Sequence, residues 1–193
     1  MEEIFFMIER KKIFLLLIVF SVFLLSVMAV SAEDISVDTN DFKDLDEAIK
    51  KANPDDTIIL NKNITENPTE IQIDKNISIN GQNNYIDANF KCGIFTISSM
   101  DNVTLTLINV TFKNACRADG GFCIVEAPNF ALDCKGDVNF YNISAKEKGG
   151  VFFLVSDSNI IINNTGNLNI NNVSSQYGGM FYIKNEKKGL SIN

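Results

Sequence analysis

A Gly-Gly pair recurs three times in this chain at a constant spacing of 29 residues. The pairs are Gly120-Gly121, Gly149-Gly150 and Gly178-Gly179, and an apolar run of four residues follows each one, at 122–125, 151–154 and 180–183. Glycine adopts backbone angles that other residues avoid, so each pair predicts a tight corner that leads into a short strand. A fixed period of this length predicts a solenoid, in which each repeat forms one coil.

A second block precedes each pair. It has apolar residues at its first, third and sixth positions, Asn at the fifth and a hydroxyl residue at the seventh, and we align it over 105–111, 138–144 and 168–174. In this alignment eight, four and three residues separate the block from the glycines. Loops of variable length between constant strands are typical of solenoids. Asn at equivalent corners can also stack as ladders along the axis.

The rest of the chain fits the same architecture. Short β-rich runs of three to five residues alternate with Asn, Asp and Gly from residue 57 onward. Coils stacked about 4.8 Å apart pair these strands in parallel, and each inward Ile, Val, Leu or Phe contributes roughly 1.5–3 kcal/mol. Residues 35–37 predict a first strand, and the apolar spacing of 41–52 predicts an amphipathic helix that covers the N-terminal end.

We therefore predict an all-β fold, a right-handed parallel β-helix with a short N-terminal capping α-helix, preceded by a signal-peptide helix. The strand and capping helix occupy residues 33–56, and the coils occupy 57–193. The last coil stops within a repeat, which predicts a truncated product. Its uncovered strands favour self-association.

The first 32 residues have the order of a secretory signal peptide. Arg10-Lys11-Lys12 precedes an apolar run at 13–30, and the small residues Ser31-Ala32 follow it. This order predicts cleavage between Ala32 and Glu33, and hence a secreted or cell-surface protein. The alternative is an uncleaved anchor, because 18 apolar residues lie at the lower edge of a membrane span.

Composition argues against several function classes. The net charge of −7 disfavours nucleic-acid binding, which needs clustered Lys and Arg. The chain has no His, the commonest general base and metal ligand, so we expect no catalytic residues, no metal and no cofactor. Arg117 with Asp119 is the only pair that suggests acid–base chemistry, and a salt bridge within a loop is the simpler interpretation.

Two further sets of residues suggest covalent modification. N-x-Ser/Thr triplets, which are candidate glycan acceptors or chance products of an Asn-rich composition, begin at Asn63, Asn76, Asn102, Asn109, Asn142, Asn163 and Asn172. Four cysteines, Cys92, Cys116, Cys123 and Cys134, fit no zinc spacing. Export permits disulfides between them in three full pairings, although Cys123 also suits a core position.

Several of these segments resemble known families. Residues 42–52 and 56–60, with 75–81 and 86–88, resemble the N-terminal cap and first coils of pectate-lyase-like β-helix proteins. Residues 112–114 followed by Gly120-Gly121 are similar to the repeat of polymorphic outer-membrane proteins. That repeat has Ala where this chain has Phe122, Val151 and Met180.

Residues 35–193 as a whole resemble the adhesin-like surface proteins of methane-producing archaea. The resemblance implies a non-catalytic cell-surface module whose partners are glycans or proteins of other cells, with membrane contact only through an uncleaved leader. A polysaccharide lyase or hydrolase on the same scaffold and a purely structural envelope component are the alternatives.

Overall fold

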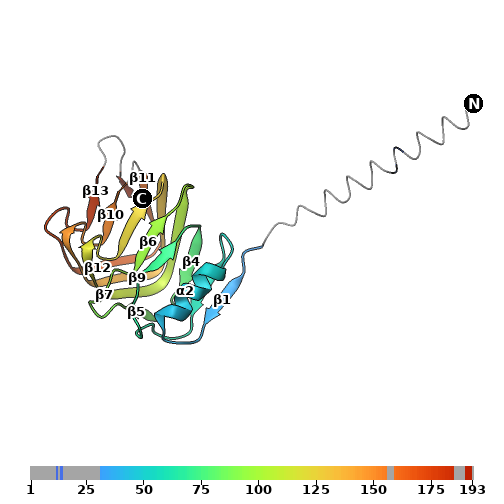
Figure 1. Ribbon diagram of the computed structural model, residues 1–193, viewed down its shortest axis with the longest axis horizontal. Coiled ribbons are helices and arrows are strands. Elements are labelled where there is room, and N and C mark those ends of the chain that lie inside the picture. Colours follow the sequence, from blue (N-terminus) through green and yellow to red (C-terminus); the bar gives the residue numbers. More distant parts are fainter. Residues whose placement is uncertain (1–11, 13, 15–30, 156–158, 185–189, 193) are drawn as a thin grey trace, which may run out of the picture. The chain divides into compact units, whose positions relative to one another are not determined.

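The computed structural model describes residues 12, 14, 31–155, 159–184 and 190–192. The chain divides into two compact units, Met1–Ser31 and Ala32–Asn193. The first unit, which holds nearly all of the predicted signal peptide, lies outside the described residues except for three positions. The second unit contains the strands and the helix described below (Figure 1).

The strands of this unit form two sheets, and all pairs of strands in them are parallel. The larger sheet has the order β1 (Asp34–Val37), β2 (Thr57–Leu60), β4 (Ile77–Asn80), β7 (Val103–Asp119), β9 (Asn129–Lys148), β11 (Asn159–Asn164) and β14 (Leu190–Ile192). Beside this path, β5 (Tyr85–Asp87) pairs with β7 and β12 (Asn167–Ser174) pairs with β9. The smaller sheet has the order β13 (Phe181–Ile183), β10 (Phe152–Leu154), β8 (Cys123–Glu126), β6 (Phe95–Ser98) and β3 (Ile71–Ile73).

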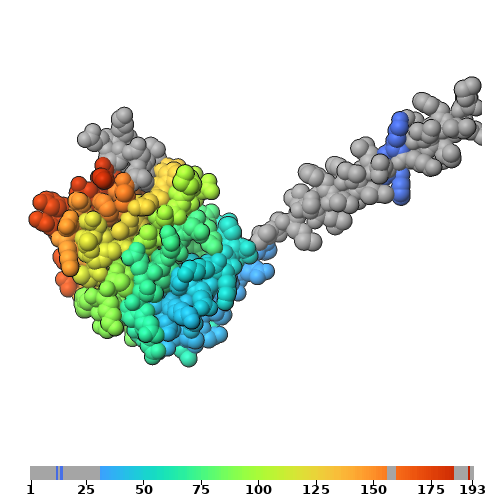
Figure 2. Space-filling model, in the orientation of Figure 1, coloured from blue at the N-terminus to red at the C-terminus, as the bar shows by residue number. Residues whose placement is uncertain are grey.

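From β2 onward the chain passes alternately through the two sheets, so each circuit adds one strand or more to both. The result is a parallel β-solenoid of about four turns. In Figure 2 the colours cross this unit in bands from blue to red, because successive coils lie one on the next. The predicted all-β parallel β-helix is confirmed.

The Gly-Gly pairs lie at stacked corners, as predicted. The strands after them are in register, with Cys123 paired to Phe152 and Phe152 to Phe181, which reproduces the spacing of 29 residues. Gly120, Gly149 and Gly178 have φ angles of +60°, +60° and +80°. The second glycines stack directly, since a Cβ on Gly121 would collide with the carbonyl oxygen of Gly150 and a Cβ on Gly150 with that of Gly179. Both positions of the pair therefore require glycine, the first for its backbone angle and the second for space.

The register corrects the predicted alignment of the second block. Val110 pairs with Val138 and Cys116 with Ser144, so the equivalent of 138–144 is 110–116 and not 105–111. Leu105 pairs instead with Leu132. The alternation of apolar and polar residues is common to all these strands, and Cys116 lacks the hydroxyl that marks the other two blocks. In the observed register three, four and three residues precede the glycines, so this loop is nearly constant in length.

Two strands are much longer than the predicted three to five residues. β7 has 17 residues and β9 has 20. Their pairing continues around corners of the coil, with a register shift between Ile108 and Val110, where Asn109 has a φ of +45°. Asn tolerates this left-handed conformation, so it turns the chain without ending the ladder. The prediction of short strands was wrong because it treated each Asn as a strand end.

The predicted Asn ladder is present at the next corner. The Nδ2 atom of Asn172 donates to Oδ1 of Asn142 (2.7 Å), Asn142 donates to Asn114 (3.0 Å), and Asn114 donates to the carboxylate of Asp87 (3.0 Å). The three Asn residues have φ angles of +51° to +53°. Each of them therefore turns the backbone and joins its coil to the one before.

The interior between the sheets contains a column of phenylalanine rings. Phe95, Phe112, Phe122, Phe140 and Phe152 are almost fully buried. The ring centroids of neighbouring pairs lie 4.7 to 6.2 Å apart, mostly edge to face. These contacts join three successive coils, so burial of one coil depends on the next.

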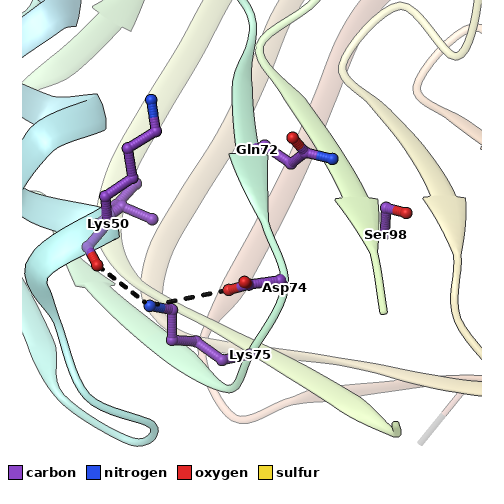
Figure 3. A pocket seen from close by; sticks show the side chains of 6 residues that line it. Lys50, Gln72, Asp74, Lys75 and Ser98 are labelled. Atoms are coloured by element: carbon purple, nitrogen blue, oxygen red, sulfur yellow. Dashed lines mark hydrogen bonds and ion pairs between the residues drawn. The ribbon is translucent and has the colours of Figure 1, made fainter. Parts of the chain in front are cut away.

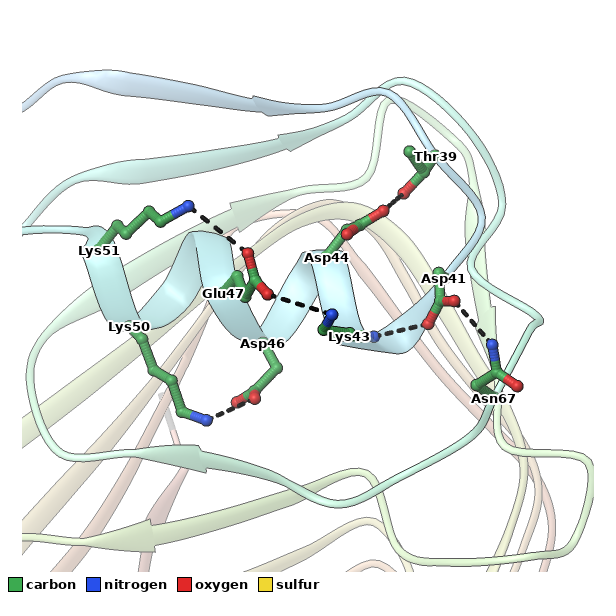
Figure 4. A network of polar contacts seen from close by, with 9 residues as sticks. All are labelled: Thr39, Asp41, Lys43, Asp44, Asp46, Glu47, Lys50, Lys51 and Asn67. Atoms are coloured by element: carbon green, nitrogen blue, oxygen red, sulfur yellow. Dashed lines mark hydrogen bonds and ion pairs between the residues drawn. The ribbon is translucent and has the colours of Figure 1, made fainter.

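The helix α2 (Phe42–Lys51) contacts β1 and β3 at the N-terminal end of the stack (Figure 1). Asp41 caps its start by accepting from Lys43 N (2.8 Å) and Asn67 Nδ2 (2.7 Å), and these bonds lower the pKa of Asp41 (Figure 4). The buried residues are Phe42, Leu45, Ala48 and Ile49. The exposed face carries i,i+4 ion pairs such as Lys50–Asp46 (2.5 Å), which add little stability. The predicted capping helix is confirmed.

The ladder predicts a measurable loss of stability when one rung is removed. Asn142→Ala deletes two hydrogen bonds and places alanine in a left-handed conformation, so we expect the free energy of unfolding in urea to fall by about 2–3 kcal/mol. Asn142→Gly relieves the backbone strain and isolates the ladder, with an expected loss of about 1–2 kcal/mol. Asn171→Ala, at an exposed position on β12, is the control. Equal effects of Asn142→Gly and Asn171→Ala would contradict a stabilising ladder.

Candidate functional site

A hollow opens on the surface where the loop between β5 and β6 meets the ends of β7 and β9. Its cavity volume is about 390 Å³. We call it the Phe90 hollow, and it is lined by Glu70, Phe90, Lys91, Cys92, Gly93, Cys116, Arg117, Ala118 and Lys146. These residues come from four successive coils, so the sequence separates them widely and only the stacking brings them together.

The hollow is positively charged on an acidic protein. Lys91 and Lys146 are exposed at its edge. The third cation, Arg117, is paired with Glu70 at 2.8 Å, so the two lysines leave a local excess of positive charge. The whole chain carries −7. This contrast favours an anionic ligand at the hollow over a neutral or cationic one.

Phe90 stands at the hollow in an unusual conformation. Its φ is +56°, in the left-handed region that bulky residues avoid, and its side chain is 58% exposed. Hydrogen bonds hold the turn in place, from Phe90 N to Asn114 O (2.6 Å) and from Lys91 N to Ala88 O (2.9 Å). Strain of about 1–3 kcal/mol persists only where surrounding contacts determine it, and such residues cluster at functional sites. The turn thus holds an aromatic ring in solvent beside two lysines.

Arg117 forms the floor of the hollow. Its guanidinium donates to the carbonyl oxygens of Gly120 (2.8 and 3.0 Å) and Phe95 (3.0 Å), and to Thr96 Oγ1 (3.2 Å). With the Glu70 pair, these bonds join three coils through a side chain that is only 10% exposed. The backbone of Gly93 lies against the guanidinium, where a Cβ would come within 2.6 Å of its Nε.

The predicted salt bridge between Arg117 and Asp119 is wrong. Asp119 instead accepts from the main-chain nitrogen of Lys148 (3.0 Å), and Arg117 turns inward to Glu70. The two residues are close in sequence, but the strand places them at different positions around the coil. The donors of Arg117 are occupied by structural acceptors, so this side chain stabilises the solenoid.

A second, smaller hollow lies beside the end of α2 (Figure 3). Its volume is about 300 Å³, and its lining residues are Ile49, Lys50, Gln72, Asp74, Lys75 and Ser98. Lys75 Nζ donates to the carbonyl oxygens of Ala52 (2.9 Å) and Lys50 (3.4 Å) and pairs with Asp74 (3.7 Å). A cation there stabilises the helix C-terminus. Lys75 is therefore engaged in capping α2, which makes this hollow the weaker candidate.

The four cysteines are free thiols in two different environments. Cys123 and Cys134 are buried in the core, and burial raises the pKa of each to about 12. Cys92 and Cys116 are partly exposed in the Phe90 hollow. Burial, and then the charge of Glu70, raise the pKa of Cys92. The structure thus confirms the core position suggested for Cys123.

The candidate glycan acceptors all make hydrogen bonds to other coils. Asn63, Asn76, Asn102 and Asn109 accept through Oδ1 from Tyr85 N (3.0 Å), Thr104 N (2.9 Å), Asn129 Nδ2 (2.6 Å) and Asp137 N (3.0 Å). Asn142, Asn163 and Asn172 donate through Nδ2, the atom to which a glycan would be attached. Their glycosylation stays a prediction. These bonds give a structural reason for Asn at each of the seven positions.

Two classes of feature are absent from the part of the chain that the structure describes. No three His, Cys, Asp or Glu side chains there are grouped as ligands of a metal ion. No helix there combines the length and apolar character needed to cross a membrane. The predicted cleavage residues Ala32 and Glu33 lie at the start of the second compact unit.

Comparisons of the chain with protein-family models, with curated proteins and with solved structures found no significant match.

The network around Arg117 predicts a large effect of its removal. Arg117→Met deletes the bonds to Gly120, Phe95 and Glu70 and leaves two inward carbonyl oxygens without their donor, so we expect a loss of about 2–4 kcal/mol in unfolding free energy. Urea denaturation followed by circular dichroism measures it. Lys146→Met, in the same hollow but exposed, is the matched control and should change stability by less than about 0.5 kcal/mol. A loss below about 1 kcal/mol for Arg117→Met would contradict the structural role.

Proposed function

We propose that this chain is an exported, adhesin-like module of the cell surface that makes non-catalytic contact with glycans or proteins of other cells. Its contact site is the Phe90 hollow, and the ligand there is an anionic saccharide. The observation that carries this proposal is the strained, exposed Phe90 beside Lys91 and Lys146 on a chain of net charge −7.

The chemistry of the hollow suits one or two sugar rings. An aromatic face packs against the apolar C–H face of a pyranose, while ammonium groups form charge-assisted bonds with a carboxylate or sulfate. A volume of about 390 Å³ falls in the range of small-molecule sites. Because the lining comes from stacked coils, the groups are already in position before a ligand arrives, which lowers the entropic loss of binding.

The commitment of Arg117 favours binding over catalysis. A lyase on this scaffold needs a basic group that faces the substrate and can accept a proton. Arg117 points its donors at main-chain carbonyls and at Glu70, and the chain contains no His. The enzyme alternative predicts release of sugar from pectin-like polymers, with or without calcium, and the purely structural alternative predicts no saccharide affinity.

Export is the second part of the proposal. It is supported by the charge, apolar run and small residues of the leader, and by a compact unit that begins at Ala32. Cell fractionation decides this part, because recovery of the chain in the cytoplasm alone would contradict it.

The hollow predicts charge-selective binding. The full chain should bind an oligouronate, measured by calorimetry at low salt, and bind the matching neutral oligosaccharide at least about tenfold more weakly. Lys91→Gln and Lys146→Gln should each weaken oligouronate binding by about tenfold, and added salt should weaken it further. Phe90→Asn keeps a residue that tolerates the left-handed turn but removes the ring, so it should weaken both ligands.

The matched control is Lys62→Gln, an exposed lysine outside the hollow. It should leave the affinity unchanged. Equal losses for Lys62 and Lys91 variants would show that binding depends on general charge and would contradict a site at Phe90.

A further inference from the structure

The main-chain nitrogen of Glu33 lies on a buried carboxylate. It donates to Oδ1 of Asp56 at 2.8 Å, and Asp56 is only 1% exposed. The other carboxylate oxygen accepts from the main-chain nitrogen of Asn53 at 2.7 Å. Asp56 is one of two buried polar or charged residues in the described part of the chain, the other being Thr106.

This nitrogen is the atom that leader cleavage would change. Hydrolysis of the Ala32–Glu33 peptide bond adds one water, which leaves a carboxylate on Ala32 and an amino group on Glu33. We propose that removal of the leader converts the Glu33 nitrogen into an α-ammonium group that pairs with Asp56 and locks β1 onto the first coil. This inference rests on the export and cleavage part of the proposed function.

The pair would strengthen a junction that already exists. Thr57 N donates to Glu33 O (2.8 Å), next to the pairing of Asp34 with Thr57 in β1 and β2. Ser78 N donates to the main-chain oxygen of Asp56 (3.0 Å), which connects the junction to β4. Replacing an amide donor by an ammonium makes the bond to Asp56 charge-assisted and about twice as strong. Asp56 thereby joins the new chain start, the turn after α2 and the second coil.

The charged groups around Asp56 leave the new amine as the titrating group. Bonds from Glu33 N and Asn53 N lower the pKa of Asp56, and the charge of Lys75 acts in the same direction, so Asp56 is ionised at neutral pH. The side chains of Glu33 and Asp55 are the neighbouring acids in sequence. An α-amino group ordinarily titrates at about 7.7–8.0, and a carboxylate partner raises that value.

The sign of the pH dependence follows from this raised value. The stabilisation is fully present below the amine's unfolded pKa, near 8, and is lost as the pH rises through the higher folded value. The chain has no His, so thiols are the other side chains that ordinarily titrate near this window. Asp56→Asn removes the carboxylate and serves as the reference for them.

The test compares two chains, one that starts at Glu33 and one that keeps Ala32. Both contain the whole described core, which lies within residues 37–162. We expect the unfolding constant of the Glu33 chain to rise about tenfold more than that of the Ala32 chain between pH 6.5 and 9.5. Asp56→Asn should abolish this difference. Identical pH profiles of the two chains, or a difference that survives Asp56→Asn, would overturn the pair.

Mass determination of the N-terminus of the exported protein separates this result from the cleavage itself. A first residue of Glu33 supports the processing step. Any other first residue overturns the proposal for the cell, whatever the purified chains show.

A different observation carries a second inference, about Cys92 and Cys116. The main-chain nitrogen of Cys116 donates to the carbonyl oxygen of Cys92 at 3.0 Å, and both residues line the Phe90 hollow. Main chains joined in this way lie roughly 5 Å apart, within the range of about 4.4–6.8 Å between Cα atoms that a disulfide needs. Both are partly exposed, whereas the thiols of Cys123 and Cys134 are buried in the core.

We infer that Cys92 and Cys116 form a disulfide between two coils in an oxidising compartment. The thiolate of one cysteine attacks oxidised glutathione, which forms a mixed disulfide and releases one reduced glutathione. The other cysteine then displaces the second glutathione. The protein loses two protons and two electrons, and the glutathione disulfide gains them.

Trypsin separates the four cysteines well enough to test this. It places Cys92 on 92–113, Cys116 on 114–117, and Cys123 with Cys134 on 118–135. After incubation of the folded full chain with oxidised glutathione, mass spectrometry should find 92–113 joined to 114–117. The thermal midpoint should rise by about 5–10 °C, and not in Cys92→Ser or Cys116→Ser. Separate glutathione adducts on both cysteines, or unmodified thiols, would overturn the pairing.

Discussion

Parallel pairing between successive coils is the constraint on which the rest of this structure depends. Each strand finds its partner one coil away, so a conformation at one position must recur at the equivalent position of the next coil or the ladder breaks. The glycine corners repeat with positive φ and the Asn corners repeat with φ near +50° for this reason. The phenylalanine column follows from the same rule, because inward positions lie above one another.

Much of this fold can be predicted from the sequence because the repeated positions use residues with special backbone preferences. The glycine pairs, the capping helix and the existence of Asn ladders follow from such preferences. The register of the first full block does not, because Ala115 and Cys116 satisfy the stacking geometry without resembling Ile143 and Ser144. Alternating apolar residues at 105–111 match the pattern equally well, and only the paired structure distinguishes them.

The Phe90 hollow is less predictable than the fold. Its groups come from four coils, and nothing in the local sequence brings Glu70 to Arg117 or Lys146 to Lys91. One signal was available: a phenylalanine between two residues common in turns and a lysine, in an Asn-rich segment where a bulky ring has no place in the core. The positive φ of Phe90 shows why the position is unusual, and it belongs to the backbone alone.

The Asn ladder also has a direction. Each amide in the chain from Asn172 to Asn114 donates toward the N-terminal coil, and the series ends on the anionic oxygen of Asp87. The amide dipoles are therefore aligned along the solenoid axis, with their positive ends facing a carboxylate. Neighbouring bonds in such a row polarise one another. The row is a side-chain counterpart of an α-helix with an acid at its N-terminus, so each coil added at its far end would strengthen the bonds already formed.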